Sequence, residues 1–215
     1  MFVEGKNNHY YYRLLSYGDL IPLKIHVNAN QLLEEIKPYK QNWKPYNPRK
    51  KNNRYGLSIT SLKGELDGFD LDSFHEHNQV HGTEYTEVSF KEKTDVYYKS
   101  NEIKKAVDPW GSTLSRSHII NLKQNGSFPP HRDWKNLECV ETFRVIIPLK
   151  SCNPSAMYFV HDGNILRFDH GRAYFLNTNK EHSLFSFVDD CYFIVLNIDC
   201  NEQALNIVID NMKDV

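Results

Sequence analysis

Short apolar runs recur at intervals of about ten residues through the second half of the chain, and they predict strands. The segments between them are too short for crossover helices, so we expect a sandwich or barrel rather than a parallel sheet. Asp162 and Gly163 form a pair typical of a two-residue hairpin turn, which needs positive φ at both positions. The expected strands are SHIINLK (117–123), FRVIIPL (143–149), AMYFV (156–160), NILRF (164–168), RAYFLN (172–177), SLFSF (183–187) and CYFIVLNI (191–198).

Helical spacing is found in shorter segments around this strand-rich part. Residues 28–38 place their large apolar side chains on one face, with Asn28 as the N-cap and Pro38 as the stop. Residues 100–110 predict a helix that ends before a proline. Residues 201–212 predict a closing helix, because their apolar side chains again recur at helical spacing behind an asparagine cap.

The organisation of the chain favours a single domain. Its 215 residues suffice for one sizeable core, and the sequence has no internal repeat, low-complexity tract or clear linker. Within the domain, residues 1–110 form a mixed α/β flanking region. Residues 111–200 form the strand-rich core, and residues 201–215 form the C-terminal helix.

Composition excludes several classes of protein. The net charge of −1 shows no bias toward nucleic acid or anionic lipid, and no apolar run is long enough to span a membrane. The beginning of the sequence lacks the layout of an export signal, so a cytoplasmic location is expected. The segment from Lys37 to Arg54 is basic with interleaved aromatics. It could cover phosphates, but the pattern is more typical of a solvated basic loop.

The cysteines point to a reducing compartment. They stand at positions 139, 152, 191 and 200, with neither the spacing of a Cys-x-x-Cys motif nor the density of a disulfide scaffold. We therefore expect reduced thiols.

The stretch NGSFPPHRDW (125–134) carries the candidate chemistry. Its two prolines stiffen the backbone and cannot donate to a sheet ladder, so they hold His131 and Asp133 in a definite place. We expect this pair at a strand edge just after a rigid turn. With 10 histidines and 27 acidic residues in the chain, about one such pair arises by chance, so the motif alone is weak. A polar loop that happens to contain a histidine is the alternative.

His182 strengthens the case for a metal, because it leads the expected strand 183–187. In a jelly roll, strands this far apart in sequence can return to face each other. Two imidazoles and one carboxylate on one face of an ion leave positions open, an arrangement that suits non-haem Fe(II). Zinc sites that keep an open position are the nearest alternative.

Three ordered motifs resemble a known family. They are RSHIINLKQNGSFPPHRD (116–133), FRVIIPLKSCNP (143–154) and GRAYFLNTNKEHSLFSF (171–187). From about Arg54 to Asp199 the chain resembles the aspartyl/asparaginyl β-hydroxylase-like branch of the Fe(II)/2-oxoglutarate-dependent dioxygenases, which includes proline hydroxylases. This resemblance implies a mainly β fold, the double-stranded β-helix (a cupin-like jelly roll), with a few flanking α-helices.

The resemblance also implies a site. His131, Asp133 and His182 would be the catalytic Fe(II) ligands, with 2-oxoglutarate as cosubstrate, and the strand-opening arginine of the second motif would face acid groups. The sequence departs from the family where an arginine is expected after the distal histidine, because Cys191 and Tyr192 stand there. The candidate cofactor-binding residues are therefore Arg144 first and Arg172 second, helped by hydroxyls such as those of Tyr192 and Ser117.

The implied function is hydroxylation of an unactivated C–H bond in an amino acid, free or within a peptide or protein. Its partners would be that substrate and dioxygen, with no membrane and no nucleic acid expected. Two alternatives remain open: a catalytically silent metal-binding jelly roll that binds a ligand, and a metal-dependent cupin enzyme that does not use 2-oxoglutarate.

Other conspicuous residues have simpler explanations. The histidines of FHEHNQVH (74–81) suggest a metal cluster, but a solvated loop is favoured there. His118 is expected to be a satisfied strand residue or a neighbour of the site, and His161 and His170 are expected to be exposed beside hairpin turns. Trp134 either walls the pocket or packs in the core. The N-terminal half of the chain and the loop of residues 134–142 are candidates for contacts with the substrate.

Overall fold

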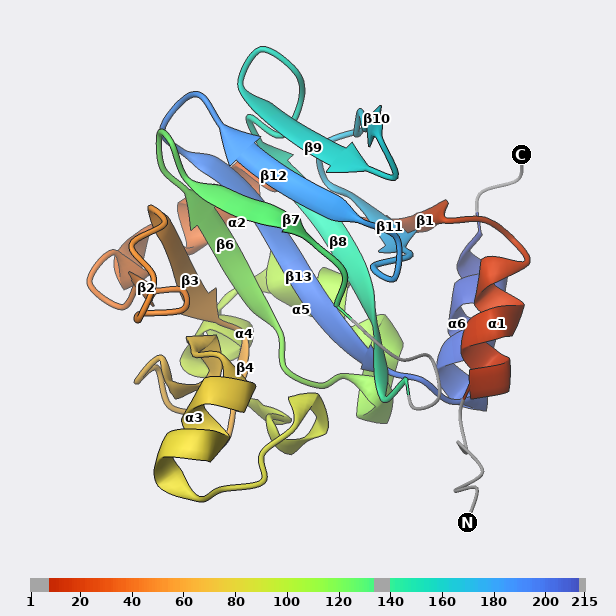
Figure 1. Ribbon diagram of the computed structural model, residues 1–215, viewed down its shortest axis with the longest axis horizontal. Coiled ribbons are helices and arrows are strands. Elements are labelled where there is room, and N and C mark those ends of the chain that lie inside the picture. Colours follow the sequence, from red (N-terminus) through yellow and green to blue (C-terminus); the bar gives the residue numbers. More distant parts are fainter. Residues whose placement is uncertain (1–7, 134–139, 213–215) are drawn as a thin grey trace.

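The computed structural model describes residues 8–133 and 140–212 (Figure 1). The strands are β1 (Leu20–His26), β2 (Lys44–Pro45), β3 (Arg54–Ser58), β4 (Thr60–Ser61), β5 (Glu92–Lys93), β6 (His118–Leu122), β7 (Ser127–His131), β8 (Thr142–Lys150), β9 (Met157–His161), β10 (Asn164–Ile165), β11 (Arg172–Leu176), β12 (His182–Ser186) and β13 (Cys191–Asp199). The α-helices are α1 (Asn8–Leu15), α2 (Ala29–Glu35), α3 (Phe74–His81), α4 (Asp95–Lys99), α5 (Asn101–Val107) and α6 (Glu202–Asn211). Short 3-10 helices are η1 (Lys37–Tyr39), η2 (Phe69–Leu71), η3 (Glu87–Ser89) and η4 (Asp108–Thr113).

Two antiparallel sheets form the body of the fold. The larger has seven strands in the order β1-β11-β8-β13-β6-β3-β2, and the smaller has four in the order β10-β9-β12-β7. Apart from the β9–β10 hairpin within the small sheet, successive strands from β6 onward alternate between the two sheets, so the chain winds as a double-stranded β-helix. The predicted mainly β jelly roll with flanking helices is confirmed. Strands β4 and β5 form a separate two-stranded sheet.

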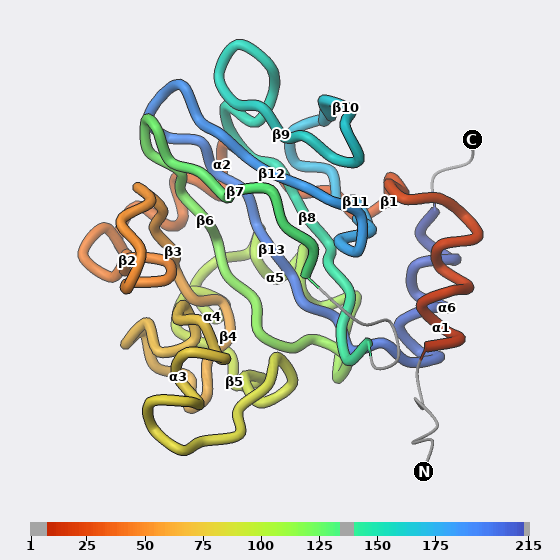
Figure 2. The backbone as a smooth tube through the Cα atoms, in the orientation of Figure 1, coloured from red at the N-terminus to blue at the C-terminus, as the bar shows by residue number. Residues whose placement is uncertain are grey.

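The apolar side chains divide into two layers on either side of the large sheet. One cluster lies between the two sheets and includes Ile120, Phe159 and Phe193. The other lies on the outer face of the large sheet, where Ile119 and Ile194 pack with side chains from the helices. Helices α1 and α6 lie side by side at one end of the molecule (Figure 2). The alternation of neighbouring residues such as Ile119 and Ile120 follows from the two-residue period of a strand.

Local signals in the sequence account for several element ends. The side chain of Asn28 accepts a hydrogen bond from the backbone N–H of Gln31 and caps α2, and Asn201 caps α6 in the same way. Asp162 and Gly163 both adopt positive φ, at 48° and 78°, between the paired strands β9 and β10. The predicted caps and the predicted hairpin are therefore confirmed.

The proline pair lies in a strand, where the sequence predicted a turn. Pro129 and Pro130 belong to β7, which is an edge strand of the small sheet. An edge position tolerates proline because one side of the strand needs no ladder hydrogen bonds. His131 is thus the last residue of the strand itself.

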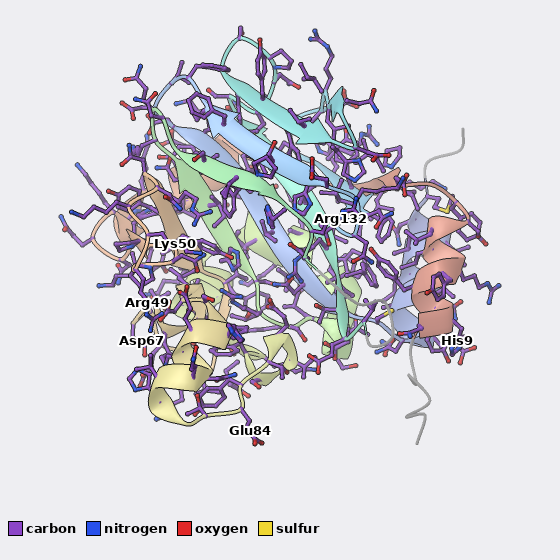
Figure 3. All side chains as sticks on the ribbon, viewed as in Figure 1. His9, Arg49, Lys50, Asp67, Glu84 and Arg132 are labelled. Carbon is purple, nitrogen blue, oxygen red and sulfur yellow. The ribbon has the colours of Figure 1, made fainter. Side chains whose placement is uncertain are left out.

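The expected loop at residues 74–81 is also wrong, because this segment forms helix α3. Gly82 ends the helix in the left-handed conformation with a φ of 64°, and the ring of His77 packs edge-on against Phe69 at 4.4 Å between centroids. Two acids, Asp72 just before the helix and Glu76 within it, meet the basic segment. Arg49 pairs with Asp72 at 2.5 Å and, like Lys50, lies beside α3 (Figure 3).

Within the described part of the chain, no helix has both the length and the apolar character needed to cross a bilayer.

Candidate metal centre

Two strand ends bring the predicted ligands together. His131 closes β7 and His182 opens β12, and the two residues are direct partners in the antiparallel register. Asp133 follows two residues after His131, and its backbone N–H donates to the carbonyl of Thr178 at 3.0 Å. Metal-binding atoms of all three side chains lie within 4.8 Å of one another. The structure therefore places two imidazoles and one carboxylate where a single ion could contact all three.

Backbone carbonyls orient both imidazole rings. The Nδ1 atom of His131 lies 2.7 Å from the carbonyl oxygen of Pro129, and that of His182 lies 3.0 Å from the carbonyl oxygen of Lys180. A carbonyl can only accept, so each Nδ1 carries the hydrogen and each neutral ring keeps its lone pair on Nε2. These Nε2 atoms lie 3.5 and 3.7 Å from Oδ1 of Asp133. This is the orientation that a metal-ligating histidine adopts when a second group holds its other nitrogen.

An arginine holds the carboxylate of Asp133 from the other side. Arg144 Nε lies 3.1 Å from Asp133 Oδ2, and Arg144 Nη2 lies 3.2 Å from Glu87 Oε1. Burial raises the pKa of Asp133, but the charge of Arg144 and the hydrogen bond with His131 outweigh it and hold that pKa well below its ordinary value. The group is therefore an ionised carboxylate, the form that binds a cation.

The two histidines differ in their surroundings. Burial lowers the pKa of His182, which favours the neutral ring. The hydrogen bond with Asp133 raises the pKa of His131 above its ordinary value. A bound cation would compete with that proton for the same nitrogen.

A cavity of about 110 Å³ opens beside these side chains, between the two sheets. Most of its wall is apolar, and the polar groups are the candidate ligands together with the side chains of Arg144, His118, Tyr46 and Thr178. The remaining wall is formed by Ile120, Phe128, Ile146, Phe159, Leu176, Leu184, Phe193 and Val195.

His118 belongs to this wall. It is 2% exposed, and its Nδ1 has no hydrogen-bond partner among residues 8–133 and 140–212. Burial and the nearby arginines lower its pKa well below the ordinary value, so the ring is neutral. His118 was expected to be either a strand residue with its hydrogen bonds satisfied or a neighbour of the site. Its unpaired Nδ1 and its place in the cavity wall favour the second role.

Among the arginines expected to bind a cofactor, only Arg144 lies in the described lining of the cavity. Arg172 donates to the carbonyl oxygen of Leu23 and pairs with Asp169, so it joins β11 to β1 instead. Tyr192 points to the outer face of the large sheet, and Ser117 donates to the carbonyl oxygen of Ser115 in the buried segment directly before β6. The structure does not bring these three residues to the cavity.

On β13, where the family would carry an arginine, apolar side chains face the cavity. The side chains of Phe193 and Val195 take the positions of this strand that face the cavity, while Tyr192 faces outward. The positively charged group in the described wall is thus supplied by β8 rather than by β13.

The sequence did not predict the roles of two residues near the site, Glu87 and His161. Glu87 joins Arg144 to Arg116, but it comes from a 3-10 turn in the flanking region, and no local pattern marks it. His161 was expected to be exposed, and this is wrong. It is 5% exposed, it faces His182 across the β9–β12 pair, and its Nε2 lies 2.8 Å from the carbonyl oxygen of Asn177. Trp134 and most of the 134–142 segment lie outside the described residues.

Comparisons with known proteins give likenesses among solved structures only. The sequence matches no protein-family model and no curated protein. An oxidoreductase of the 2OG-Fe(II) oxygenase family from Burkholderia pseudomallei is 13% identical, with 90% of each chain covered and a TM-score of 0.47. A Pseudomonas putida prolyl-4-hydroxylase is 9% identical, with 87% of this chain and 95% of its own covered and a TM-score of 0.47. A Trichoplax adhaerens prolyl hydroxylase, in complex with a hypoxia inducible factor peptide fragment, is 10% identical, with 92% and 91% covered and a TM-score of 0.48.

Proposed function

We propose that this protein is an Fe(II)- and 2-oxoglutarate-dependent oxygenase that hydroxylates an unactivated C–H bond of an amino acid, free or within a peptide or protein. The observation that carries the proposal is the convergence of His131, Asp133 and His182 at the mouth of a cavity between the two sheets. Both imidazoles present Nε2 to the same carboxylate oxygen, as ligands of one ion would.

The donor set fits iron better than the common structural metals. A neutral imidazole pair with one carboxylate leaves several coordination positions open, which is the arrangement used by non-haem Fe(II) oxygenases. A structural zinc site would instead have four protein ligands. Among the described residues, these three side chains form the only cluster of histidine, cysteine and acidic groups close enough to hold an ion.

In the proposed reaction the side chains bind the iron, orient its ligands and exclude water. The Nε2 atoms of His131 and His182 and a carboxylate oxygen of Asp133 would hold the iron, and iron with 2-oxoglutarate and dioxygen supplies the oxidant for C–H cleavage. Arg144 keeps the Asp133 carboxylate in place and is the charged partner available to an acid group of the cosubstrate. The apolar wall excludes water from the bonds that react.

The substrate class rests on the resemblance of the three sequence motifs. An amino acid carries its own charged groups, and these need partners near the metal because an unpaired charge is costly in an apolar cavity. Tyr46 and Thr178 line the described wall and would offer hydroxyl groups. We propose them as contacts to the cosubstrate or substrate.

One observation favours a second candidate function. Strand β13 presents Phe193 and Val195 to the cavity, and Arg144 is already engaged by Asp133 and Glu87. Without 2-oxoglutarate there is no far carboxylate to bind, so no arginine beyond Arg144 is required in the cavity. A metal-dependent cupin enzyme that does not use 2-oxoglutarate, or a ligand-binding module without catalysis, would fit this lining.

Succinate release and cosubstrate binding test the proposal together. We expect the Fe(II)-loaded protein to convert 2-oxoglutarate to succinate, and we expect Asp133→Ala to abolish this turnover. His75→Ala is the matched control, because His75 is an exposed histidine on α3. Calorimetric titration of the Mn(II)-loaded protein with 2-oxoglutarate should show micromolar binding. Binding of metal without 2-oxoglutarate would favour the second candidate, and unchanged turnover in Asp133→Ala would remove the assignment of the ligands.

A further inference from the structure

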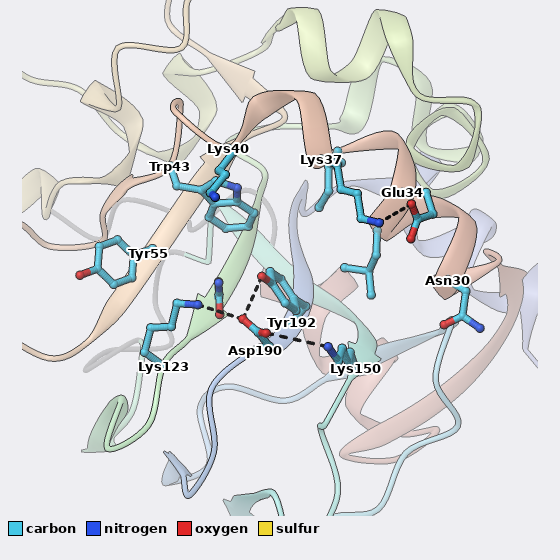
Figure 4. A pocket seen from close by; sticks show the side chains of 13 residues that line it. Asn30, Glu34, Lys37, Lys40, Trp43, Tyr55, Lys123, Lys150, Asp190 and Tyr192 are labelled. Atoms are coloured by element: carbon cyan, nitrogen blue, oxygen red, sulfur yellow. Dashed lines mark hydrogen bonds and ion pairs between the residues drawn. The ribbon is translucent and has the colours of Figure 1, made fainter.

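A second cavity lies on the outer face of the large sheet. It measures about 830 Å³, within the range of small-molecule sites, and α2, η1 and the following loop wall it on one side (Figure 4). Its lining comprises Asn30, Leu33, Glu34, Ile36, Lys37, Lys40, Trp43, Tyr55, Asn121, Lys123, Lys150, Asp190 and Tyr192. We call it the outer pocket.

The sheet register explains why these side chains meet. Tyr55, Asn121, Tyr192 and Lys150 are consecutive partners across β3, β6, β13 and β8, so they form one row on the same face. The residues beside them in sequence, such as Phe193, point into the roll instead. The outer pocket and the candidate metal centre therefore lie on opposite faces of the same strands.

Aromatic and apolar groups form one part of the pocket wall. The rings of Trp43 and Tyr192 meet edge to face, with centroids 5.8 Å apart, and Tyr55 stands in the same row. Leu33 and Ile36 add aliphatic surface from the α2 side. Aromatic faces that remain half-exposed in a concave site suit a flat ring.

The charges in the pocket leave a positive excess. Four lysines line it against two carboxylates. Asp190 is shared by Lys123, at 2.9 Å, and Lys150, at 3.9 Å, so one carboxylate faces two ammonium groups (Figure 4). Lys37 pairs with Glu34 at 2.5 Å, whereas Lys40 has no partner among the described residues. The excess favours a ligand with negative charge.

Asn121 supplies an unused polar group at the floor of the pocket. Its side chain is 5% exposed, and Oδ1 has no hydrogen-bond partner in the described structure. Buried polar atoms are almost always paired, so an orphaned amide in a cavity wall points to a ligand that completes it. An amide of this kind can pair with the edge of a nitrogen heterocycle.

The outer pocket also accounts for part of the basic and aromatic pattern in the sequence. Lys37, Lys40 and Trp43 all belong to the segment from Lys37 to Arg54. The sequence favoured a solvated loop for this segment. Its first part instead forms a wall of the pocket, and Arg49 and Lys50 pair with acids near α3.

We propose that the outer pocket binds a small organic anion that carries a flat aromatic ring, of about the size of a mononucleotide. The ring lies against Trp43 and Tyr192 and reaches the amide of Asn121. The anionic group, a phosphate or a carboxylate, lies between Lys40 and Lys123. This binding does not depend on the metal centre.

Calorimetry on the 215-residue chain tests the proposal with defined probes. Adenosine 5′-monophosphate joins a ring to a phosphate, adenosine has the ring alone, and ribose 5-phosphate has the anion alone. Indole-3-acetate tests a carboxylate in place of the phosphate. We expect at least one of the two aromatic anions to bind with a Kd below about 1 mM, and adenosine and ribose 5-phosphate to bind at least about tenfold more weakly.

Substitutions then locate the site. The double variant Lys40→Gln, Lys123→Gln should weaken binding of the aromatic anion about tenfold or more, and Lys51→Gln, an exposed lysine of the same segment outside the pocket, should change it less than twofold. Asn121→Ala should also weaken binding, and within the part of the chain that the structure describes this variant loses no hydrogen bond to Oδ1, because that atom is unpaired there.

Three results of these titrations would overturn the proposal, and a fourth comes from the metal-site variant Asp133→Ala. The three are no binding of either aromatic anion, equal binding of ribose 5-phosphate, and equal loss in the double variant and in Lys51→Gln. Asp133→Ala must bind the probe as the unmodified protein does. Loss of probe binding in that variant would place the anion at the metal centre and would also overturn the outer pocket, whatever the result of the succinate assay.

Discussion

His131 and His182 face each other across the β7–β12 pair, and each holds its Nδ1 atom against the carbonyl of the residue two positions before it. The orientation of both rings is therefore set by backbone at a strand end rather than by a neighbouring side chain. Pro129 lies in the paired strand β7 and Lys180 lies two residues before the start of β12, so the two Nε2 atoms are positioned by backbone at strand ends before any ion arrives.

Metal affinity should depend steeply on this pair of rings. Replacing His182 with Ala removes one of the nitrogen atoms that lie within 4.8 Å of the other candidate ligand atoms. We expect the affinity for Co(II), measured by its visible absorption, to fall by a factor of about 100 or more, beyond the effect of losing an outer hydrogen bond alone. His170→Ala, which alters an exposed histidine outside the cavity, should leave the titration unchanged. Equal affinities in the two variants would contradict the metal centre.

Arg144 should matter for stability as well as for the site. It lies between the carboxylates of Asp133 and Glu87, and all three side chains are largely buried. Arg144→Met leaves two buried carboxylates without this partner, so we expect a loss of about 3–5 kcal/mol in the free energy of unfolding by urea. Arg172→Met is the matched control, because its partner Asp169 is 70% exposed, and it should cost about 1 kcal/mol or less.

Variants at the same two arginines test cosubstrate binding. If Arg144 contacts an acid group of 2-oxoglutarate, binding to the Mn(II)-loaded protein should be lost in Arg144→Lys, which keeps the charge but not the planar fork. Arg172→Met should bind 2-oxoglutarate normally, since Arg172 lies outside the described lining of the cavity. The reverse result would give the role to Arg172.

Features carried by local sequence were predictable, and features that depend on long-range packing were not. The asparagine caps, the hairpin at Asp162 and the two-residue alternation of the strands follow from rules that act within a few residues. The convergence of His182 with the distant pair His131 and Asp133 was expected from the strand pattern of a jelly roll and from the spacing of motifs that resemble a family.

The wrong predictions also concern residues whose environment is set by long-range packing. His161 flanks a turn, which suggests exposure, but its partner across the sheet is buried His182. Glu87 carries no local signal because its role comes from two arginines on other elements. The proline pair predicts a turn because an edge strand cannot be told from a turn until the neighbouring strands are known.

Two glycines with similar backbone conformations should respond very differently to substitution. Gly163 has a φ of 78° and open space where a methyl group would lie, whereas at Gly171, with a φ of 85°, a Cβ atom would lie 2.3 Å from the carbonyl oxygen of Val27. Gly163→Ala should cost only the left-handed conformation, about 1 kcal/mol. Gly171→Ala must also move the backbone that joins β1 to the sheet, so we expect about 3 kcal/mol or more. Urea unfolding of the two variants would contradict this prediction if the costs were equal.

Asp70 should make the stability of the fold depend on pH. Its carboxyl group is fully buried, it accepts a hydrogen bond from Ser58 at 2.6 Å, and Arg116 is the nearby cation. Burial outweighs these contacts and raises its pKa from 3.8 to about 6. The folded protein therefore binds a proton more tightly than the unfolded chain does. The stabilisation is fully present below about pH 4 and is lost as the pH rises through about 6.

This loss should amount to about 3 kcal/mol for Asp70 alone. Asp70→Asn keeps an oxygen that can accept the hydrogen bond from Ser58, but its amide cannot ionise. Between pH 4 and pH 7 the unmodified protein should therefore lose about that much more unfolding free energy than the variant does. Asp67→Asn, which changes an exposed acid nearby in the chain, should follow the unmodified protein. If Asp70→Asn showed the same dependence on pH as the unmodified protein, the buried carboxyl would be ionised throughout and the raised pKa would be wrong.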